Sequence, residues 1–221
     1  GQTKQQVLIH VIKRGLILVL LGIIYNNGLQ IQPVSAMRFG SVLGRIGLAY
    51  MFANIIFLYT KQRGQIIWFC ALLIGYWLLL KFHPAPGFQR GDLTMQGNFA
   101  SYIDRLLLPG RLYEKIHDPE GLGSLIPAIG TGLFGILTGN FLKNSPRTPS
   151  KKAMWLAIAG VIALILAQIW NLDFPINKNL WTSSFVLRTG GISLLLIALF
   201  YYIIDVLGHR KWAFFFKVIG M

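Results

Sequence analysis

The chain has 221 residues, of which 54% are apolar and only 13% are charged. Because a soluble domain carries about 25% charged residues, this composition excludes an ordinary soluble domain and indicates a protein that crosses the lipid bilayer several times. A net charge of +14 would suggest nucleic acid as a partner of a soluble protein. Here the basic residues lie between apolar segments and the aromatic residues lie within them, so we expect a bilayer and no nucleic acid.

Six apolar segments have close to the length of about 20 residues that a spanning helix needs. They are residues 7–31, 41–59, 65–80, 125–142, 153–170 and 184–204. A further apolar run starts near Trp212, but Met221 comes too soon for that run to cross the bilayer. We therefore predict an all-α, polytopic membrane helix bundle with a partial seventh helix. Residues 1–221 would form a single, partial transmembrane domain of a chain that continues at both ends.

The charges between the segments predict the orientation. Loops on the side of the N-terminus carry twelve Lys or Arg residues and one acid, whereas the opposite loops carry nine Lys or Arg residues and six acids. Because Lys and Arg favour the cytoplasmic side, we expect the N-terminus of this chain in the cytoplasm. Residues 82–124 then form a long extracytoplasmic loop, in which the spacing of residues 99–108 predicts a short surface helix.

A stripe of small residues runs down the fourth segment. It consists of Ala128, Gly132, Gly135 and Gly139. Their spacing of three or four places all of them on one helix face, where small side chains let a second helix approach closely. We interpret the stripe as a packing surface.

Two acids, Asp118 and Glu120, stand in the sequence Asp-Pro-Glu-Gly just before the fourth segment. A proline and acids at this place are typical of a helix N-terminus, so a helix cap is the structural interpretation. The functional one is a pair of carboxylates at the outer membrane surface. Such a pair can orient an imidazole, accept hydrogen bonds from sugar hydroxyls or take a proton from an amine. Asp118 and Glu120 are our candidate catalytic residues.

Arg45 lies within the first turns of the second segment. An arginine there must reach the interface or be paired. We expect either an ion pair with Asp118 or Glu120, or a clamp on an anionic ligand such as a phosphate. Asp104 and Arg105 are expected to form a local ion pair that pins the short surface helix.

A polar run at residues 177–182 separates two long apolar segments. Taken singly, Trp181 is typical of an interfacial anchor and Lys178 of a solvated charge. Taken together with Asn177 and Asn179, they form a plausible platform for a saccharide or nucleotide. The indole offers a stacking face, and the amides offer paired donors and acceptors.

One of the four histidines, His117, stands beside Asp118. We interpret His117 as a solvated loop residue, with a catalytic role on the outer side as the alternative. The sequence contains no glycine-rich phosphate loop, nucleophile elbow or zinc motif. No metal is therefore expected.

Several blocks of the sequence resemble the transmembrane acyltransferase family of heparan-α-glucosaminide N-acetyltransferase, and its bacterial members more closely. The blocks are residues 38–50, 102–108, 118–121, 177–184, 204–206 and 216–221. Their order and spacing follow the family over nearly the whole chain. One departure is Gly44, where the family usually has a glutamine before the arginine.

The resemblance implies a membrane-bound enzyme that moves an acetyl group from cytoplasmic acetyl-CoA to the amine of a terminal glucosamine-type sugar on the extracytoplasmic side. Acetyl-CoA and an amino sugar are the implied partners, and the bacterial cytoplasmic membrane is the implied location. The proposed catalytic histidine of the family lies in a region that precedes Gly1. No residue of this chain is assigned to that role, and a homodimer stays open.

The polar residues then converge on one hypothetical cavity between the second, fourth and sixth segments. Asp118 or Glu120 would orient the catalytic imidazole or accept the proton of the sugar amine. Arg45, Lys178 and Asn179 are the candidate cofactor-binding residues, with the two cations holding CoA phosphates or balancing the acids.

The candidate substrate-binding residues are Asn177, Trp181, Asp104 and Arg105. Two other functions stay open. A transporter of small solutes or sugars would also use polar residues and glycines within its helices, although no inverted repeat is evident. An acyltransferase acting on another envelope glycan is the second alternative.

Overall fold

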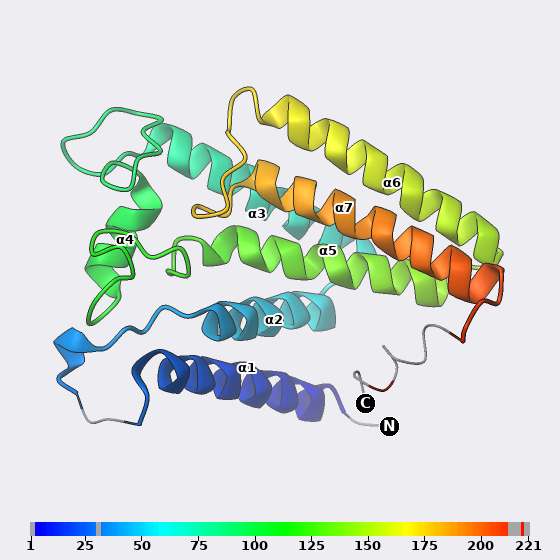
Figure 1. Ribbon diagram of the computed structural model, residues 1–221, viewed down its shortest axis with the longest axis horizontal. Coiled ribbons are helices and arrows are strands. Elements are labelled where there is room, and N and C mark those ends of the chain that lie inside the picture. Colours follow the sequence, from blue (N-terminus) through cyan, green and yellow to red (C-terminus); the bar gives the residue numbers. More distant parts are fainter. Residues whose placement is uncertain (1–2, 30–31, 212–217, 219–221) are drawn as a thin grey trace.

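The computed structural model describes residues 3–29, 32–211 and 218, and the six long helices in these ranges lie lengthwise beside one another (Figure 1). The helices are α1 (Lys4–Asn27), α2 (Val42–Tyr59), α3 (Gln62–Phe82), α4 (Phe99–Leu107), α5 (Leu125–Asn144), α6 (Pro149–Trp170) and α7 (Ser183–Tyr201). Short turns of helix are η1 (Val34–Ala36) and η2 (Tyr202–Val206). The expected seventh segment lies outside the described residues, apart from Val218.

Six of these helices, all except α4, are long and apolar enough to cross a membrane, with η2 extending the span of α7. Large apolar side chains cover their outward surfaces. The chain is therefore an integral membrane protein, and the prediction of an all-α bundle with six spanning helices is confirmed.

The observed helix ends differ from the predicted ones for local reasons. Helix α1 ends at Asn27, four residues early, because Gly28 has φ +69° and closes the helix. Helix α6 begins at Pro149, four residues early, because a proline at the first helical position needs no N–H partner. The first turn of α6 is polar, so the apolar pattern does not include it.

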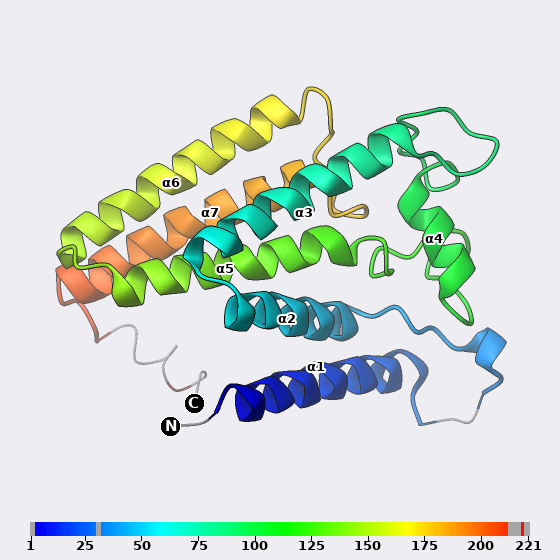
Figure 2. The same cartoon turned by 180° about the vertical axis from the view of Figure 1, so that it is seen from behind.

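The helices α6, α7, α5, α2 and α1 lie side by side in this order (Figure 1). Helix α3 packs behind α5 and α7, as the view from behind shows (Figure 2). Glycines allow the closest approaches. A Cβ on Gly47 of α2 would lie 2.6 Å from the carbonyl oxygen of Gly15 in α1, and a Cβ on Gly191 of α7 would lie 2.9 Å from that of Gly160 in α6.

The small-residue stripe of α5 packs over only half of its length. Ala128 is buried, and a Cβ on Gly132 would lie 2.9 Å from Ala53 Cβ in α2. Within residues 3–29, 32–211 and 218, no atom of another segment lies within 4 Å of a Cβ at Gly135 or Gly139. The packing interpretation is therefore wrong for the second half of the stripe, which lines cavities instead.

The long loops and α4 gather at one end of the bundle (Figure 1). We call this the polar end, and it comprises residues 32–41, 83–124 and 171–182. The opposite end holds the α2–α3 and α5–α6 turns and the start of α1. We call it the basic end because of Lys61, Arg63, Lys143, Arg147, Lys151 and Lys152.

Candidate functional site

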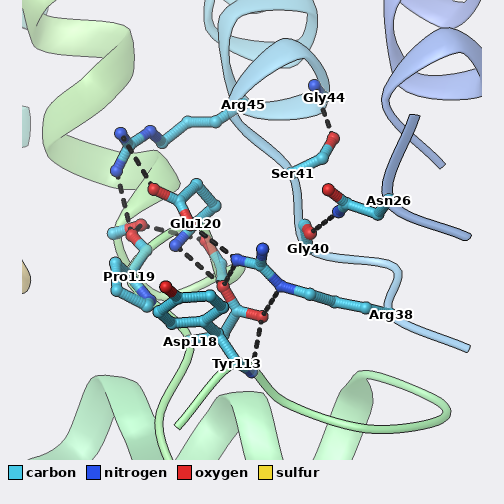
Figure 3. Close-up of polar contacts among 12 residues, drawn as sticks. Asn26, Arg38, Gly40, Ser41, Gly44, Arg45, Tyr113, Asp118, Pro119 and Glu120 are labelled. Atoms are coloured by element: carbon cyan, nitrogen blue, oxygen red, sulfur yellow. Dashed lines mark hydrogen bonds and ion pairs between the residues drawn. The ribbon is translucent and has the colours of Figure 1, made fainter. Parts of the chain in front are cut away.

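The polar end contains an ion pair between Arg38, which is partly buried, and Asp118, which is fully buried (Figure 3). Arg38 Nε donates to Asp118 Oδ2 at 2.9 Å, and Arg38 Nη2 donates to Oδ1 at 2.7 Å. The backbone amides of Tyr113 and Glu120 donate to the same carboxylate, at 3.1 Å and 3.0 Å. Each oxygen of Asp118 thus accepts two hydrogen bonds, which uses the capacity of a carboxylate.

Neighbouring residues fix Arg38 in this position. Asn27 at the end of α1 accepts from the Arg38 backbone amide at 2.8 Å and donates to its carbonyl at 2.9 Å. The guanidinium lies 4.5 Å from the centre of the Tyr113 ring. The hydrogen bond with Asp118 raises the pKa of Arg38. A Cβ on Gly40 would lie 2.8 Å from the Asp118 carboxylate, so only glycine fits there.

Glu120 lies between two arginines. Its Oε2 accepts from Arg38 Nη2 at 2.7 Å, and its Oε1 lies 3.8 Å from Arg45 Nη2. Arg45 also donates to the carbonyl oxygen of Pro119 at 2.9 Å. The predicted ion pair of Arg45 with this acidic block is confirmed for Glu120, whereas the direct partner of Asp118 is Arg38, which the sequence analysis missed.

Arg45 connects the acidic block to Trp181. The Arg45 guanidinium carbon lies 3.9 Å from the centre of the Trp181 ring. The indole is fixed in turn, because its Nε1 donates to Thr131 Oγ1 at 3.1 Å and its ring meets the edge of Phe185. Trp181 has φ +52°, an uncommon conformation for a bulky residue and one that is often retained at functional sites.

The turn around Trp181 is built by Asn177. Its Oδ1 accepts from the backbone amides of Asn179 at 2.8 Å and Leu180 at 3.2 Å. The side-chain oxygen of Asn177 therefore stabilises the turn. The side chains of Lys178 and Asn179 are exposed at the rim. Neither residue lines the two cavities below Trp181.

Two cavities meet at Trp181, where one cavity was expected. The first, of about 550 Å³, lies between α2 and α5 and has Arg45 at its polar end. The second, of about 500 Å³, lies between α5 and α7. Both are lined by Thr131, Gly135 and Trp181. The missing side chains at Gly135 and Gly139 of α5 thus leave room for these cavities.

Asp104 and Arg105 hold α4 in place. Asp104 is 1% exposed and accepts from the backbone amide of Gly123 at 3.0 Å. Arg105 points away and donates to the backbone carbonyls of Met95, Gln96 and Ile116. The expected ion pair between these neighbours is wrong, because successive residues of a helix project about 100° apart. Burial raises the pKa of Asp104 to about 6.

His117 is buried, and the expectation of a solvated loop histidine is wrong. Its Nδ1 lies 2.7 Å from Ser101 Oγ, which accepts from Asn98 Nδ2 at 2.8 Å. The Ser101 hydroxyl can donate to Nδ1 or accept from it, so this hydrogen bond fits either tautomer of the imidazole. Burial lowers the pKa of His117 against the opposing effect of Asp118. A polar residue within a long loop gave no sign of this burial.

These features define a polytopic α-helical membrane protein with a polar site at one end and cavities that lead from it into the bundle. The chain is similar to heparan-alpha-glucosaminide N-acetyltransferase of Mus musculus and of Homo sapiens, with 28% identity over 262 residues in each case. The similarity covers 94% of this chain and 40% of each relative, so the chain spans less than half the length of the curated relatives it matches. No family model matches the chain. The similarity supports a family relationship with these N-acetyltransferases.

Proposed function

We propose that this chain forms part of a membrane-bound acetyltransferase. In this proposal, acetyl-CoA is supplied at the basic end, and its acetyl group reaches the amine of a terminal glucosamine-type sugar at the polar end. The similarity to two N-acetyltransferases supports the reaction class. The observation that carries the proposal is the position of Arg45, which touches both Glu120 and Trp181 and also lines the first cavity.

The second cavity supports a donor that arrives from the basic end. Its lining extends from Thr131 near the polar end to Leu142 near the basic end, a helix length of about 16 Å. Hydroxyl groups of Thr138, Thr189 and Ser193 line it. Such a passage suits the narrow, amide-containing arm of CoA, while the cations of the basic end would attract the phosphates of the nucleotide.

The transfer itself needs an attack by the amine nitrogen on the thioester carbonyl carbon. The carbon–sulfur bond breaks, CoA leaves as the thiol, and the amine loses a proton. In the proposal, Arg45 faces the carbonyl oxygen as negative charge develops there, and Trp181 stacks on the sugar. Glu120 accepts the proton or orients the catalytic base. Asp118, whose oxygens are all bonded, positions Glu120 through Arg38.

Lys178 and Asn179 would contact the ligand from the exposed rim beside Trp181. Asn177 would stabilise the turn that carries Trp181. Asp104 and Arg105 would hold α4 in position. All of these residues lie at the polar end, and Arg45 lies beside it in the first turn of α2. These assignments divide the set into residues that face the ligand and residues that hold those in place.

The test is an assay of the purified protein with labelled acetyl-CoA and a panel of amino sugars. We expect labelled N-acetylglucosamine from glucosamine, and strongly reduced product from an Arg45→Lys variant. Labelled product with a different glycan would change the acceptor but keep the reaction class. Uptake of the sugar into vesicles without acetylation would contradict the proposal and favour a transporter.

A further inference from the structure

A third cavity opens toward the lipid at the basic end of the bundle. Its volume is about 450 Å³. Helices α3 and α6 flank it and α5 forms its floor, with Thr138 and Cys70 among an otherwise mostly apolar lining. Ile66 on α3 and Trp155 on α6 are 45% and 44% exposed. The cavity is therefore a groove that faces the hydrocarbon, and Phe134, Thr138 and Leu194 line both this groove and the cavity between α5 and α7.

Arg147 stands at the mouth of this groove, in the turn between α5 and α6. Its guanidinium carbon lies 5.4 Å from the centre of the Trp155 ring and 5.8 Å from that of Phe141. All ion pairs among residues 3–29, 32–211 and 218 lie at the polar end, so no described carboxylate neutralises Arg147. Its side-chain hydrogen bond is a long contact of 3.5 Å with Ser145.

The surrounding turn adds further positive charge. Residues 143–152 contain Lys143, Arg147, Lys151 and Lys152 and no acid. Lys152 donates to the carbonyl oxygen of Leu142 at 2.7 Å and so closes the end of α5. Lys143, Arg147 and Lys151 are exposed. An apolar groove that ends in uncompensated cations complements a molecule with an apolar chain and an anionic head.

We propose that this groove binds one anionic phospholipid. An acyl chain would lie along the floor of α5, and the phosphate would lie against the Arg147 guanidinium. The fork of an arginine matches the oxygens of a phosphate, and basic pockets between spanning helices on the positively charged side suit anionic headgroups. The two aromatic rings hold the guanidinium at the mouth before the lipid arrives.

Native mass spectrometry of the purified protein in a neutral detergent tests this. The probes are phosphatidylglycerol, phosphatidylcholine with the same chains, and glycerol phosphate. We expect one tightly retained phosphatidylglycerol and weaker binding of the other two. An Arg147→Gln variant should bind phosphatidylglycerol about fivefold more weakly, as expected for one cation at a membrane surface.

Two further variants separate this site from general attraction. Arg63→Gln removes an exposed cation of the same end outside the groove and should leave binding unchanged. Ala159→Trp fills the groove at an exposed position but keeps every charge, and should abolish tight retention. Equal losses for the Arg147 and Arg63 variants, unchanged binding to Ala159→Trp, or equal affinity for both lipids would each overturn the proposal. None of these results depends on acetyl transfer.

Discussion

Arg38 at the polar end and Arg147 at the basic end are both loop arginines that lie over an aromatic ring, but they differ in their second partner. Arg38 is mostly buried and binds two carboxylates, those of Asp118 and Glu120. Arg147 is exposed, and its contacts within the described part of the chain are with two aromatic rings and a serine hydroxyl. The first arrangement fixes two loops that are 80 residues apart in the chain. The second leaves a cation ready for a ligand.

The difference shows how the same side chain serves two purposes in one bundle. A buried guanidinium must be compensated, since an unpaired buried charge costs several kcal/mol. The acids of the polar end supply that compensation and thereby build the site. An exposed guanidinium at the membrane surface needs none, and its charge stays available to orient the chain or to bind an anion.

The largest expected effect comes from breaking the buried pair. Asp118→Ala removes four hydrogen bonds and leaves Glu120 as the remaining carboxylate partner of Arg38, and we expect a loss on the order of 3 kcal/mol in the free energy of unfolding. Asp118→Asn should lose less, because its oxygen still accepts a hydrogen bond. Chemical denaturation in detergent measures both. If both variants kept wild-type stability while losing acetyl transfer, Asp118 would act in catalysis and not in positioning.

The next effect is a pH dependence at the same end. The pKa of Asp104 is 3.8 in the reference state and about 6 in the fold, so the folded protein binds this proton more tightly. The stabilisation by protonation is complete below about pH 4 and is lost as pH rises through 6, on the order of 3 kcal/mol in total. Thermal unfolding between pH 4 and 7 should show this slope, and Asp104→Asn should flatten it. The same dependence of stability on pH in the wild type and the Asp104→Asn variant would contradict the assignment of this proton to Asp104.

A smaller effect sharpens the comparison between the two ends. Arg45→Lys keeps the charge but loses the planar contact with Trp181, which is worth about 2 kcal/mol in a desolvated setting. We expect kcat/KM for acetyl transfer to fall about 30-fold. The matched variant at the basic end, Arg147→Lys, should change kcat/KM less than about twofold. Equal effects of the two variants would mean that the stacking of Arg45 has no special role.

The smallest effect is expected at an exposed pair of the polar end. Lys81 Nζ donates to Asp173 Oδ1 at 2.5 Å, and Trp77 Nε1 donates to Asp173 Oδ2 at 2.8 Å. These hydrogen bonds lower the pKa of Asp173, but solvent screens an exposed pair. Asp173→Asn should therefore leave the thermal midpoint of unfolding unchanged. A clear drop in the midpoint would show that this exposed ion pair contributes to stability as the ion pair of Arg38 and Asp118 does.

Much of the fold could be predicted from the sequence because a bilayer imposes length and apolarity on every spanning helix. The six segments and the short helix at Phe99–Leu107 follow from that constraint and from helical spacing. The link between Arg45 and Glu120 was also predictable, since an arginine inside a span needs a partner.

The rest depended on contacts between distant segments. Arg38 lies in a loop, where a solvated charge is the ordinary outcome, and nothing near it in the sequence indicates Asp118. His117 looked exposed for the same reason, although Ser101 and the loop fold bury it. The cavities along Gly135 and Gly139 require the positions of α2 and α7, which no local pattern gives.

The account is tested most directly by the sidedness of the reaction. The protein would be reconstituted in vesicles with one orientation, and labelled acetyl-CoA and glucosamine would be placed in either compartment. We predict labelled product when acetyl-CoA faces the basic end and glucosamine faces the polar end, and little product in the reverse arrangement. Product formed only when both substrates share one compartment would contradict a transfer between the two ends.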